Sequence, residues 1–291
     1  MMDRRRFVRR MGALVPALSA GRFATPRLSR RLGRVGLELY SVRGAMQRDP
    51  EKTLADVAAI GYTDVELLWS FGNFGRTPSQ VRATLDAVGL KAPSAHIAPQ
   101  LVTTGWARAL DDAKLLGHEY LIAPGLPAET RASLDAWRRW ADLFNTAGEA
   151  ARRMGVWLAF HNEPDHMRPV EGAVPYDVFV ARLDPALVRL QLDVGNMVMG
   201  GGDPMAYLHR HMDRYWSFHV KDVRADKKSD TGLGQGIVDL KGLLGMVPDI
   251  ERKPCFVEQE GAPKRPGGGH LGLCVLEQAG VLAAPPAPAR A

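Results

Sequence analysis

The sequence predicts a single α/β domain, a (β/α)8 TIM barrel in which eight parallel strands alternate with helices. Short apolar runs alternate with longer amphipathic ones along the chain, which is the pattern of βα units around a parallel sheet. The chain has 291 residues, 46% of them hydrophobic, which suits one such barrel and its core. The predicted strands are Val35 to Tyr40, Asp64 to Leu68, Lys91 to His96, Tyr120 to Ala123, Val156 to His161, Val188 to Asp193, Trp216 to Val220 and Pro254 to Glu258.

Capping residues mark the ends of the first helices. Asp49 is placed to cap a helix over Pro50 to Ile60, where proline suits the first helical position and Gly61 suits the end. Thr77 and Gly89 bound a second helix in the same way.

The net charge of +6 is distributed unevenly, and the distribution argues against a nucleic-acid partner. Residues 1–34 contain ten arginines and the single acid Asp3, so the rest of the chain carries a net charge of −3. The body of the protein is therefore mildly acidic and lacks the basic excess that nucleic-acid binding needs.

The basic N-terminus has the features of an export leader. Arg4, Arg5, Arg6 and Phe7 precede an apolar stretch from Met11 to Ala20, and the Arg-Arg-x-Phe core resembles a twin-arginine signal. The stretch is too short to span a bilayer, so we expect no membrane span. Residues 1–34 are predicted to be the leader of a periplasmic or exported protein; the alternative is a disordered basic segment without a targeting role.

The remaining chain divides into a barrel and a short tail. We expect the barrel over residues 35–282 and a disordered tail over the alanine- and proline-rich residues 283–291. Cys255 and Cys274 do not make a disulfide framework, and two separate buried thiols are expected.

Polar side chains gather at the ends of the predicted strands, where a (β/α)8 barrel builds its active site. Strand side chains alternate in direction, so His161 and Glu163 are expected to point the same way. The polar residues at these strand ends are His96; His161, Asn162 and Glu163; Asp193; His219, Lys221 and Asp222; and Glu258, Gln259 and Glu260.

This mixture of carboxylates and imidazoles suits one divalent ion, namely Mn, Co, Zn or Mg, rather than copper or an iron–sulfur cluster. Four neighbouring strands that end in such groups predict a metal site at the barrel mouth. The alternative is that the groups cap loops or pair with arginines.

Ordered matches along the body resemble one known family, the xylose-isomerase-like sugar phosphate isomerases and epimerases. The resemblance implies a divalent metal, manganese among the candidates, held by a strand-five residue, Asp193, His219 and Glu258. The matching segments are Gly36-Leu-Glu-Leu-Tyr-Ser-Val-Arg43, Asp49-Pro-Glu-Lys-Thr-Leu54, Ile60-Gly-Tyr62, Ser94-Ala-His96, Leu192-Asp-Val-Gly-Asn196, Gly202-Asp-Pro204, Phe218-His-Val-Lys-Asp222 and Val257-Glu-Gln-Glu260.

Strand five departs from the family. Many members carry a Glu-x-His arrangement there and a subgroup reads Tyr-His-Asn-His, whereas this chain has Phe160-His-Asn-Glu163. His161 occupies the place of the usual glutamate and Glu163 that of the second histidine. Both remain candidate ligands, and Glu163 is favoured because a third carboxylate would hold a hard cation better.

The expected chemistry is isomerisation, epimerisation or elimination on a small sugar, ketose or cyclitol. A divalent ion that chelates the oxygens of an α-hydroxy ketone stabilises an enediolate, and a carboxylate or histidine takes the proton. The resemblance implies a glutamate at the metal as this base, here Glu258 or the strand-five group of His161 and Glu163. Lys221 or His96 would position or protonate oxygens. Inosose dehydration and cleavage of 3-keto-glycosides stay open beside epimerisation. The residues expected to contact substrate are Tyr40, Glu66, Trp69, Asn196, Asp222 and Glu260.

Two other classes of function compete with this reading. One is a barrel that binds carbohydrate or serves as a partner subunit without catalysis, for which the altered strand-five motif is the argument. The other is an endonuclease IV-like nuclease, against which the acidic body and the small number of histidines argue. A homo-oligomer is compatible with the family, and no single segment predicts one.

Overall fold

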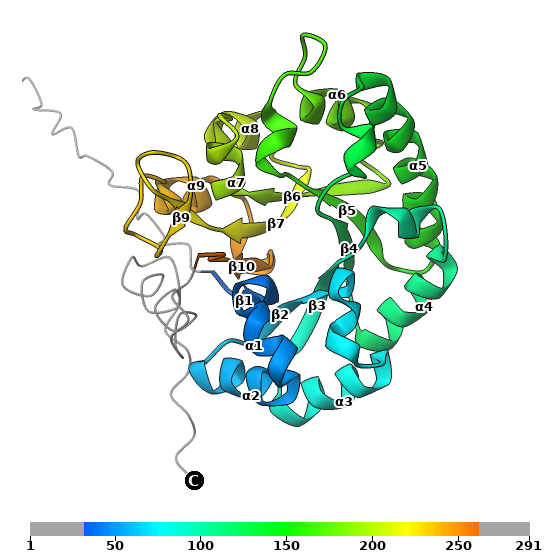
Figure 1. The fold of residues 1–291 in the computed structure, drawn as a ribbon, viewed down its shortest axis with the longest axis vertical. Helices are drawn as coiled ribbons and strands as arrows, with labels where there is room; N and C mark the ends of the chain where they lie inside the picture. Colours follow the sequence, from blue (N-terminus) through cyan, green and yellow to red (C-terminus); the bar gives the residue numbers. More distant parts are fainter. Residues whose placement is uncertain (1–31, 262–291) are drawn as a thin grey trace, which may run out of the picture.

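The computed structural model describes residues 32–261 and forms a closed parallel barrel. The strand order around the barrel is β1-β10-β7-β6-β5-β4-β3-β2, so each strand lies beside its neighbour in the chain and the last closes on the first (Figure 1). The predicted fold class is confirmed. The barrel strands are β1 Val35–Glu38, β2 Asp64–Leu68, β3 Lys91–His96, β4 Tyr120–Ala123, β5 Trp157–His161, β6 Val188–Asp193, β7 Tyr215–Val220 and β10 Cys255–Val257.

The predicted strands differ from the observed ones only at their ends. β1 stops at Glu38, two residues before the predicted end, because a 3-10 helix, η1 Leu39–Val42, begins there. β10 is one residue shorter at each end than predicted. A small antiparallel pair, β8 Asp222–Val223 and β9 Asp230–Thr231, follows β7 outside the barrel.

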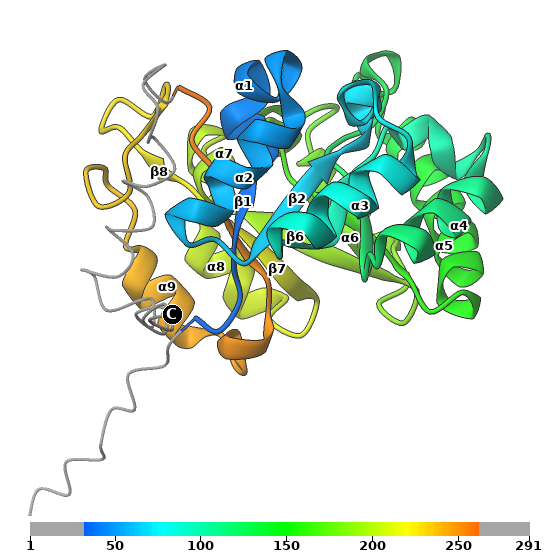
Figure 2. The ribbon, with the colours of Figure 1, turned by 90° about the horizontal axis from the view of Figure 1, so that it is seen from below.

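Helices surround the barrel and cover the outer faces of its strands (Figures 1 and 2). The longest of those described is α5, whose buried face packs on β5 and α6. The α-helices are α1 Arg43–Arg48, α2 Pro50–Ile60, α3 Pro78–Val88, α4 Trp106–Leu116, α5 Leu134–Arg153, α6 Pro175–Arg182, α7 Val194–Met199, α8 Pro204–Arg210 and α9 Leu240–Met246. The other 3-10 helices are η2 Trp69–Gly75, η3 Pro99–Val102, η4 Ala128–Thr130, η5 Pro164–Met167 and η6 Ile250–Arg252.

The predicted helix caps are confirmed at α2 and α3. The Asp49 side chain accepts a hydrogen bond from Lys52 N at 2.9 Å, and Thr77 forms a capping box at the start of α3. Gly61 and Gly89 end these helices with φ of 113° and 75°, the left-handed region that glycine enters without strain.

Cys255 is a buried free thiol in β10, as predicted. Cys274, residues 1–31 of the predicted leader and the predicted tail over residues 283–291 lie outside the described residues. Leu32 is buried, and Arg34 donates to Glu119 at 2.8 Å, so these residues at the end of the predicted leader pack against the barrel. Within residues 32–261, no helix has the length and apolarity needed to cross a membrane.

A cationic stack lies at the end of the barrel where the strands begin. The Arg189 guanidinium lies between the Trp157 and Trp216 rings, 3.4 Å from each centroid. It also donates to the Tyr120 hydroxyl at 2.9 Å. Partly desolvated cation–π contacts of this kind stabilise a fold, and this end of a (β/α)8 barrel serves stability rather than catalysis.

We predict that Arg189→Ala lowers the free energy of unfolding by about 2–4 kcal/mol, because two ring contacts and the packing of the side-chain stem are lost together. Urea unfolding followed by tryptophan fluorescence would measure it. The control is Arg152→Ala, since exposed Arg152 lies over the other face of Trp157 at 3.6 Å. An equal effect of both variants would refute the role of the enclosed stack.

Candidate active site

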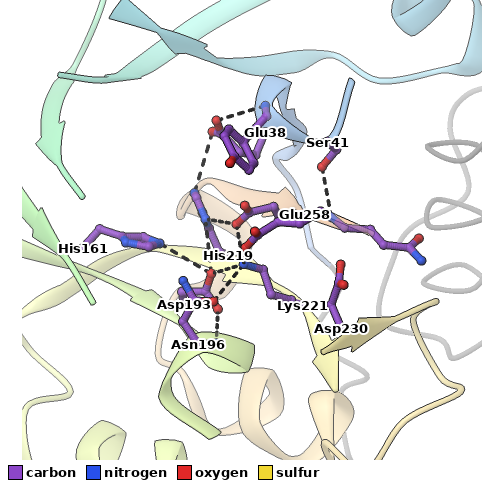
Figure 3. Close-up of polar contacts among 12 residues, drawn as sticks. Glu38, Ser41, His161, Asp193, Asn196, His219, Lys221, Asp230 and Glu258 are labelled. Atoms are coloured by element: carbon purple, nitrogen blue, oxygen red, sulfur yellow. Dashed lines mark hydrogen bonds and ion pairs between the residues drawn. The ribbon is translucent and has the colours of Figure 1, made fainter. Parts of the chain in front are cut away.

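Four side chains converge at the carboxyl ends of neighbouring strands (Figure 3). His161 and Asp193 are the last residues of β5 and β6, His219 lies near the end of β7, and Glu258 follows β10. Asp193 and His219 are direct partners in the β6–β7 register. One potential ligand atom from each of the four residues lies within 4.8 Å of the others, and all four side chains are buried. The structure thus brings together these four candidate ligands.

The donor atoms in this group fit a divalent cation. Both ring nitrogens of His161 are buried and make no hydrogen bond among the described residues, and Asp193 Oδ2 is buried with the Lys221 ammonium 2.9 Å away. Asp193 Oδ2 lies 3.5 Å from His161 Nε2 and 3.7 Å from His219 Nδ1. Buried polar atoms without partners are costly, and two imidazoles with two carboxylates form a donor set that suits Zn, Mn or Co.

The charge states of three of these residues, His161, Asp193 and Glu258, also suit a cation. Burial lowers the pKa of His161 to about 4, so its imidazole is neutral and free to ligate at neutral pH. Burial opposes ionisation of Asp193, but the Lys221 ammonium and the His161 and His219 rings together outweigh it and hold the pKa of that carboxyl well below its ordinary value. Burial likewise opposes ionisation of Glu258, and Lys221 and His219 lower its pKa.

Glu163 lies at the edge of the four-residue group. Its Oε1 is 3.8 Å from His161 Nδ1, its Oε2 accepts from Asn196 Nδ2 at 3.0 Å, and its side chain is 34% exposed. The sequence favours Glu163 over His161 as the ligand on charge grounds; the structure places His161 inside the group instead. The reason is that β5 ends at His161, and Glu163 already belongs to the turn into η5, where its backbone N–H donates to His166.

The environment of Glu163 differs from that of the other carboxylates at the mouth. Burial raises its pKa to about 8, and Lys221 only partly offsets this effect. Glu163 therefore holds a proton more readily than Asp193 and Glu258, whose pKa values are lowered.

Lys221 is fully buried beside the group, and its ammonium holds several acids together. Its Nζ lies 2.9 Å from Asp193 Oδ2, 3.1 Å from Glu258 Oε2 and 2.7 Å from Glu260 Oε1. It also donates to Asn196 Oδ1 at 3.0 Å. This places Asn196 and Glu260, two predicted substrate contacts, around the ammonium.

Gly195 explains how the Lys221 side chain reaches this position. A Cβ atom at residue 195 would lie 2.6 Å from Lys221 Cγ, a distance that real side chains do not tolerate. The glycine in Asp-Val-Gly-Asn therefore leaves room for the stem of Lys221.

A second layer of polar groups lies inside the barrel next to His219. Glu66, predicted to contact substrate, is fully buried, and His219 Nε2 lies 2.6 Å from its Oε1. His96, a predicted catalytic residue, stacks on His219 with ring centroids 5.2 Å apart. Burial opposes ionisation of Glu66, but His96 and His219 keep its pKa well below the ordinary value.

Sequence reasoning missed Glu38, Ser94 and Gln191 in this layer. All three are buried, and Glu38 pairs with Glu66 in the β1–β2 register. Burial and the charge of Glu66 raise the pKa of Glu38 well above its ordinary value. The available signal was a polar side chain at an inward position of an otherwise apolar strand.

The other predicted substrate contacts lie near the mouth or serve the fold. Tyr40 is half-buried after β1, with its ring edge-on to Phe71 at 6.0 Å. Trp69 follows β2 and packs against His118. The carboxylate of Asp222, which the sequence predicts as a substrate contact, instead accepts the backbone N–H groups of Val223, Gly236 and Val238 and anchors the loop after β7.

Residues 54–272 match the protein family described as xylose isomerase-like TIM barrel. The chain belongs to this family. The match covers most of the barrel, including the four grouped residues, and confirms the resemblance that the sequence motifs indicate.

Known relatives of this xylose isomerase-like barrel include inosose dehydratases. The enzyme from Geobacillus kaustophilus is 29% identical over 202 residues, which are 60% of this chain and 63% of that relative. The one from Lacticaseibacillus casei is 26% identical over 204 residues, 62% of this chain and 65% of that relative. The matched part of the chain thus spans less than two thirds of the length of these relatives.

The fold is also that of a solved sugar phosphate isomerase/epimerase from Parabacteroides distasonis. The two structures superpose with a TM-score of 0.74 at 24% identity, covering 87% of this chain and 97% of the other. This likeness supports the fold of the whole described barrel.

Removal of the buried ammonium tests the charge balance of the site. We predict that Lys221→Met lowers the free energy of unfolding by about 3–5 kcal/mol at neutral pH, because Asp193 and Glu258 lose their buried counter-charge. The deficit should shrink as the pH falls, since protonation removes the uncompensated negative charge. Urea unfolding of metal-free protein at pH 7.5 and pH 5 would measure it; equal deficits at both pH values would contradict this account.

Proposed function

We propose that this protein is a divalent-metal-dependent enzyme that eliminates water from a keto-cyclitol of the inosose class. The observation that carries the proposal is the buried group of His161, Asp193, His219 and Glu258, whose potential ligand atoms lie within 4.8 Å of one another and include the two unpartnered ring nitrogens of His161. The matches to inosose dehydratases supply the substrate class. Each of the four strand ends carries a residue that can ligate a metal, and this complete set favours an enzyme over a barrel that only binds carbohydrate.

These four residues would hold the ion. A solved structure of the same fold, the IOLI protein, contains a zinc atom; it is 14% identical to this chain, with a TM-score of 0.63. When bound, such an ion acts as a Lewis acid that polarises the substrate carbonyl and its neighbouring hydroxyl. We propose His161 rather than Glu163 as the strand-five ligand. Both ring nitrogens of His161 are buried inside the group without a hydrogen-bond partner, whereas Glu163 lies at its edge and accepts a hydrogen bond from Asn196.

The two glutamates at the mouth divide the acid and base roles. Glu258 is ionised and would take the proton from the carbon next to the carbonyl. Glu163, whose pKa is raised to about 8, would give its proton to the hydroxyl on the next carbon, which leaves as water. The C–H and C–O bonds break, a carbon–carbon double bond forms, and the proton released to Glu258 balances the one supplied by Glu163. The carbon that lost its proton carries a hydroxyl, so the product is an enol, which tautomerises to the diketone.

Lys221 and Asn196 orient these groups. The Lys221 ammonium keeps Glu258 ionised and places a fixed positive charge beside the negative charge that develops on the substrate oxygens. Asn196 links the two sides, since its Oδ1 accepts from Lys221 and its Nδ2 donates to Glu163. The Asn196 side chain therefore fixes the position of the Glu163 carboxyl relative to the Lys221 ammonium.

Metal content and turnover test the proposal together. We expect wild-type protein to hold about one equivalent of Mn, Co, Zn or Mg and to convert inosose to a dehydrated diketone. Asp193→Asn removes an ionised ligand, so we expect both its metal affinity and its turnover to fall by at least about 100-fold. Elemental analysis and ultraviolet detection of the product would measure this. Asp142→Asn, which changes only an exposed ion pair with Arg182, is the control.

The contrary outcomes separate the alternatives. Turnover of ketoses with no elimination from inosose would replace the dehydratase by an epimerase or isomerase at the same site. Wild-type protein that stays metal-free after incubation with these ions would refute the catalytic mechanism and leave a carbohydrate-binding barrel.

We also propose that the protein is exported in the folded state through the leader that contains Arg4 and Arg5. Replacement of both by lysine should abolish export, because twin-arginine recognition requires the arginine pair. Cell fractionation of a host that expresses the full chain would measure it, with Arg9→Lys as the control. Undiminished export of the double variant would contradict the proposal.

A further inference from the structure

His219 has a carboxylate at each ring nitrogen, and the two carboxylates belong to different layers of the barrel. Nδ1 faces the mouth, 2.7 Å from Glu258 Oε2 and 3.7 Å from Asp193 Oδ2. Nε2 faces the barrel interior, 2.6 Å from Glu66 Oε1. The nitrogen available to an ion at the mouth is therefore Nδ1, and Nε2 is left to donate its proton to Glu66.

We propose that Glu66 is a positioning residue, which fixes the ring of His219 with Nδ1 toward the metal and Nε2–H toward its own carboxylate. The inference rests on the proposed metal site and adds to it a residue that touches neither metal nor substrate. A carboxylate on the far nitrogen of a ligating imidazole sets the tautomer and orientation of the ring and makes the ligand more basic.

The carboxylate of Glu66 is itself held rigidly. It is fully buried, and Gln191 Nε2 donates to its two oxygens at 3.0 and 3.2 Å. Ser94 Oγ donates to Oε2, and His96 Nε2 lies 3.0 Å from Oε1. Ser94 is the register partner of Glu66 on β3, so the backbone of the barrel fixes this contact. A carboxylate held on several sides can direct a ring with little freedom to move.

The same geometry argues against a second ion in the inner layer. Ligand atoms of Glu38, Glu66, His96 and His219 also lie within 4.8 Å of one another. An ion bound by all four residues would need Nε2 of His219 while Nδ1 serves the mouth, which requires a doubly deprotonated imidazolate bridge. The oxygens of Glu66 already accept the hydrogen bonds that a carboxylate can take from its surroundings. Among the buried ligand atoms of these four residues, only Glu38 Oε2 has no hydrogen-bond partner within residues 32–261. The inner layer is therefore better suited to support one ion at the mouth than to hold a second ion.

The first experiment compares Glu66→Gln with Glu38→Gln. Both replace a buried acid of the inner layer by an amide of the same shape, but Glu38 Oε2 lies 3.9 Å from His219 Nε2, beyond hydrogen-bonding distance. We expect Glu66→Gln to bind Co²⁺ 10–100-fold more weakly and to shift its visible absorption, and Glu38→Gln to bind within about threefold of wild type. Calorimetric titration and the cobalt spectrum read this out without any activity assay.

Two results would overturn the inference. One is unchanged cobalt affinity and spectrum in Glu66→Gln. The other is a wild type that binds two equivalents of metal, of which Glu66→Gln loses one, since Glu66 would then be a ligand of a second ion. Should Glu66→Gln fail to fold by circular dichroism, Glu66→Asp keeps the charge at greater distance and should weaken binding by an intermediate amount; wild-type affinity there would count against the inference.

A wild type that binds no metal would refute the proposed function without deciding the role of Glu66. In that case the His219 ring proton on Nε2, observed by ¹H–¹⁵N NMR in metal-free protein, decides it. We expect a strongly downfield resonance that moves upfield in Glu66→Gln and stays in place in Glu38→Gln. A resonance unaffected by Glu66→Gln would overturn the inference.

Discussion

Two buried cations, Lys221 and the ring of His219, hold the acids of the barrel mouth together. Lys221 Nζ lies within 3.1 Å of Asp193, Glu258 and Glu260, and His219 is in contact with Glu66 and Glu258 on opposite sides. Ionised carboxylates without such partners would be expelled from the low-dielectric interior or would become protonated. The candidate active site can therefore exist inside the barrel only because positive groups are distributed among its acids.

This charge balance also determines which charges a bound metal ion would replace. In the protein without metal, burial opposes protonation of His219, but Glu66 and Glu258 raise its pKa well above the ordinary value, so the ring is an imidazolium. An ion bound at Nδ1 would replace one proton and keep the local charge positive. Metal binding should accordingly release protons. Lys221 would remain beside the candidate ligands as a second, permanent positive charge. It already neutralises part of the negative charge of Asp193 and Glu258, so less is left for the ion to neutralise.

The inner and outer layers of polar groups differ in what their side chains contact. The outer layer contains groups that reach the mouth, such as Glu163 and Glu258, whose pKa values are shifted in opposite directions. The inner layer contains Glu66, Ser94 and Gln191, which bind one another and His219. A barrel interior built in layers allows this separation, because each strand contributes alternate side chains to successive levels.

The sequence alone determined the alternation of strands and helices, the caps of α2 and α3, and the polar residues at the strand ends, because these depend on local periodicity and turn chemistry. It did not determine which strand-five residue joins the group of candidate ligands, since that depends on where β5 stops: His161 is inside, and Glu163 is already in the turn. It also did not show that Glu66 serves His219, a residue 153 positions away in the chain. Only closure of the barrel brings them into contact, because local pattern contains no information on which side chains meet across the interior.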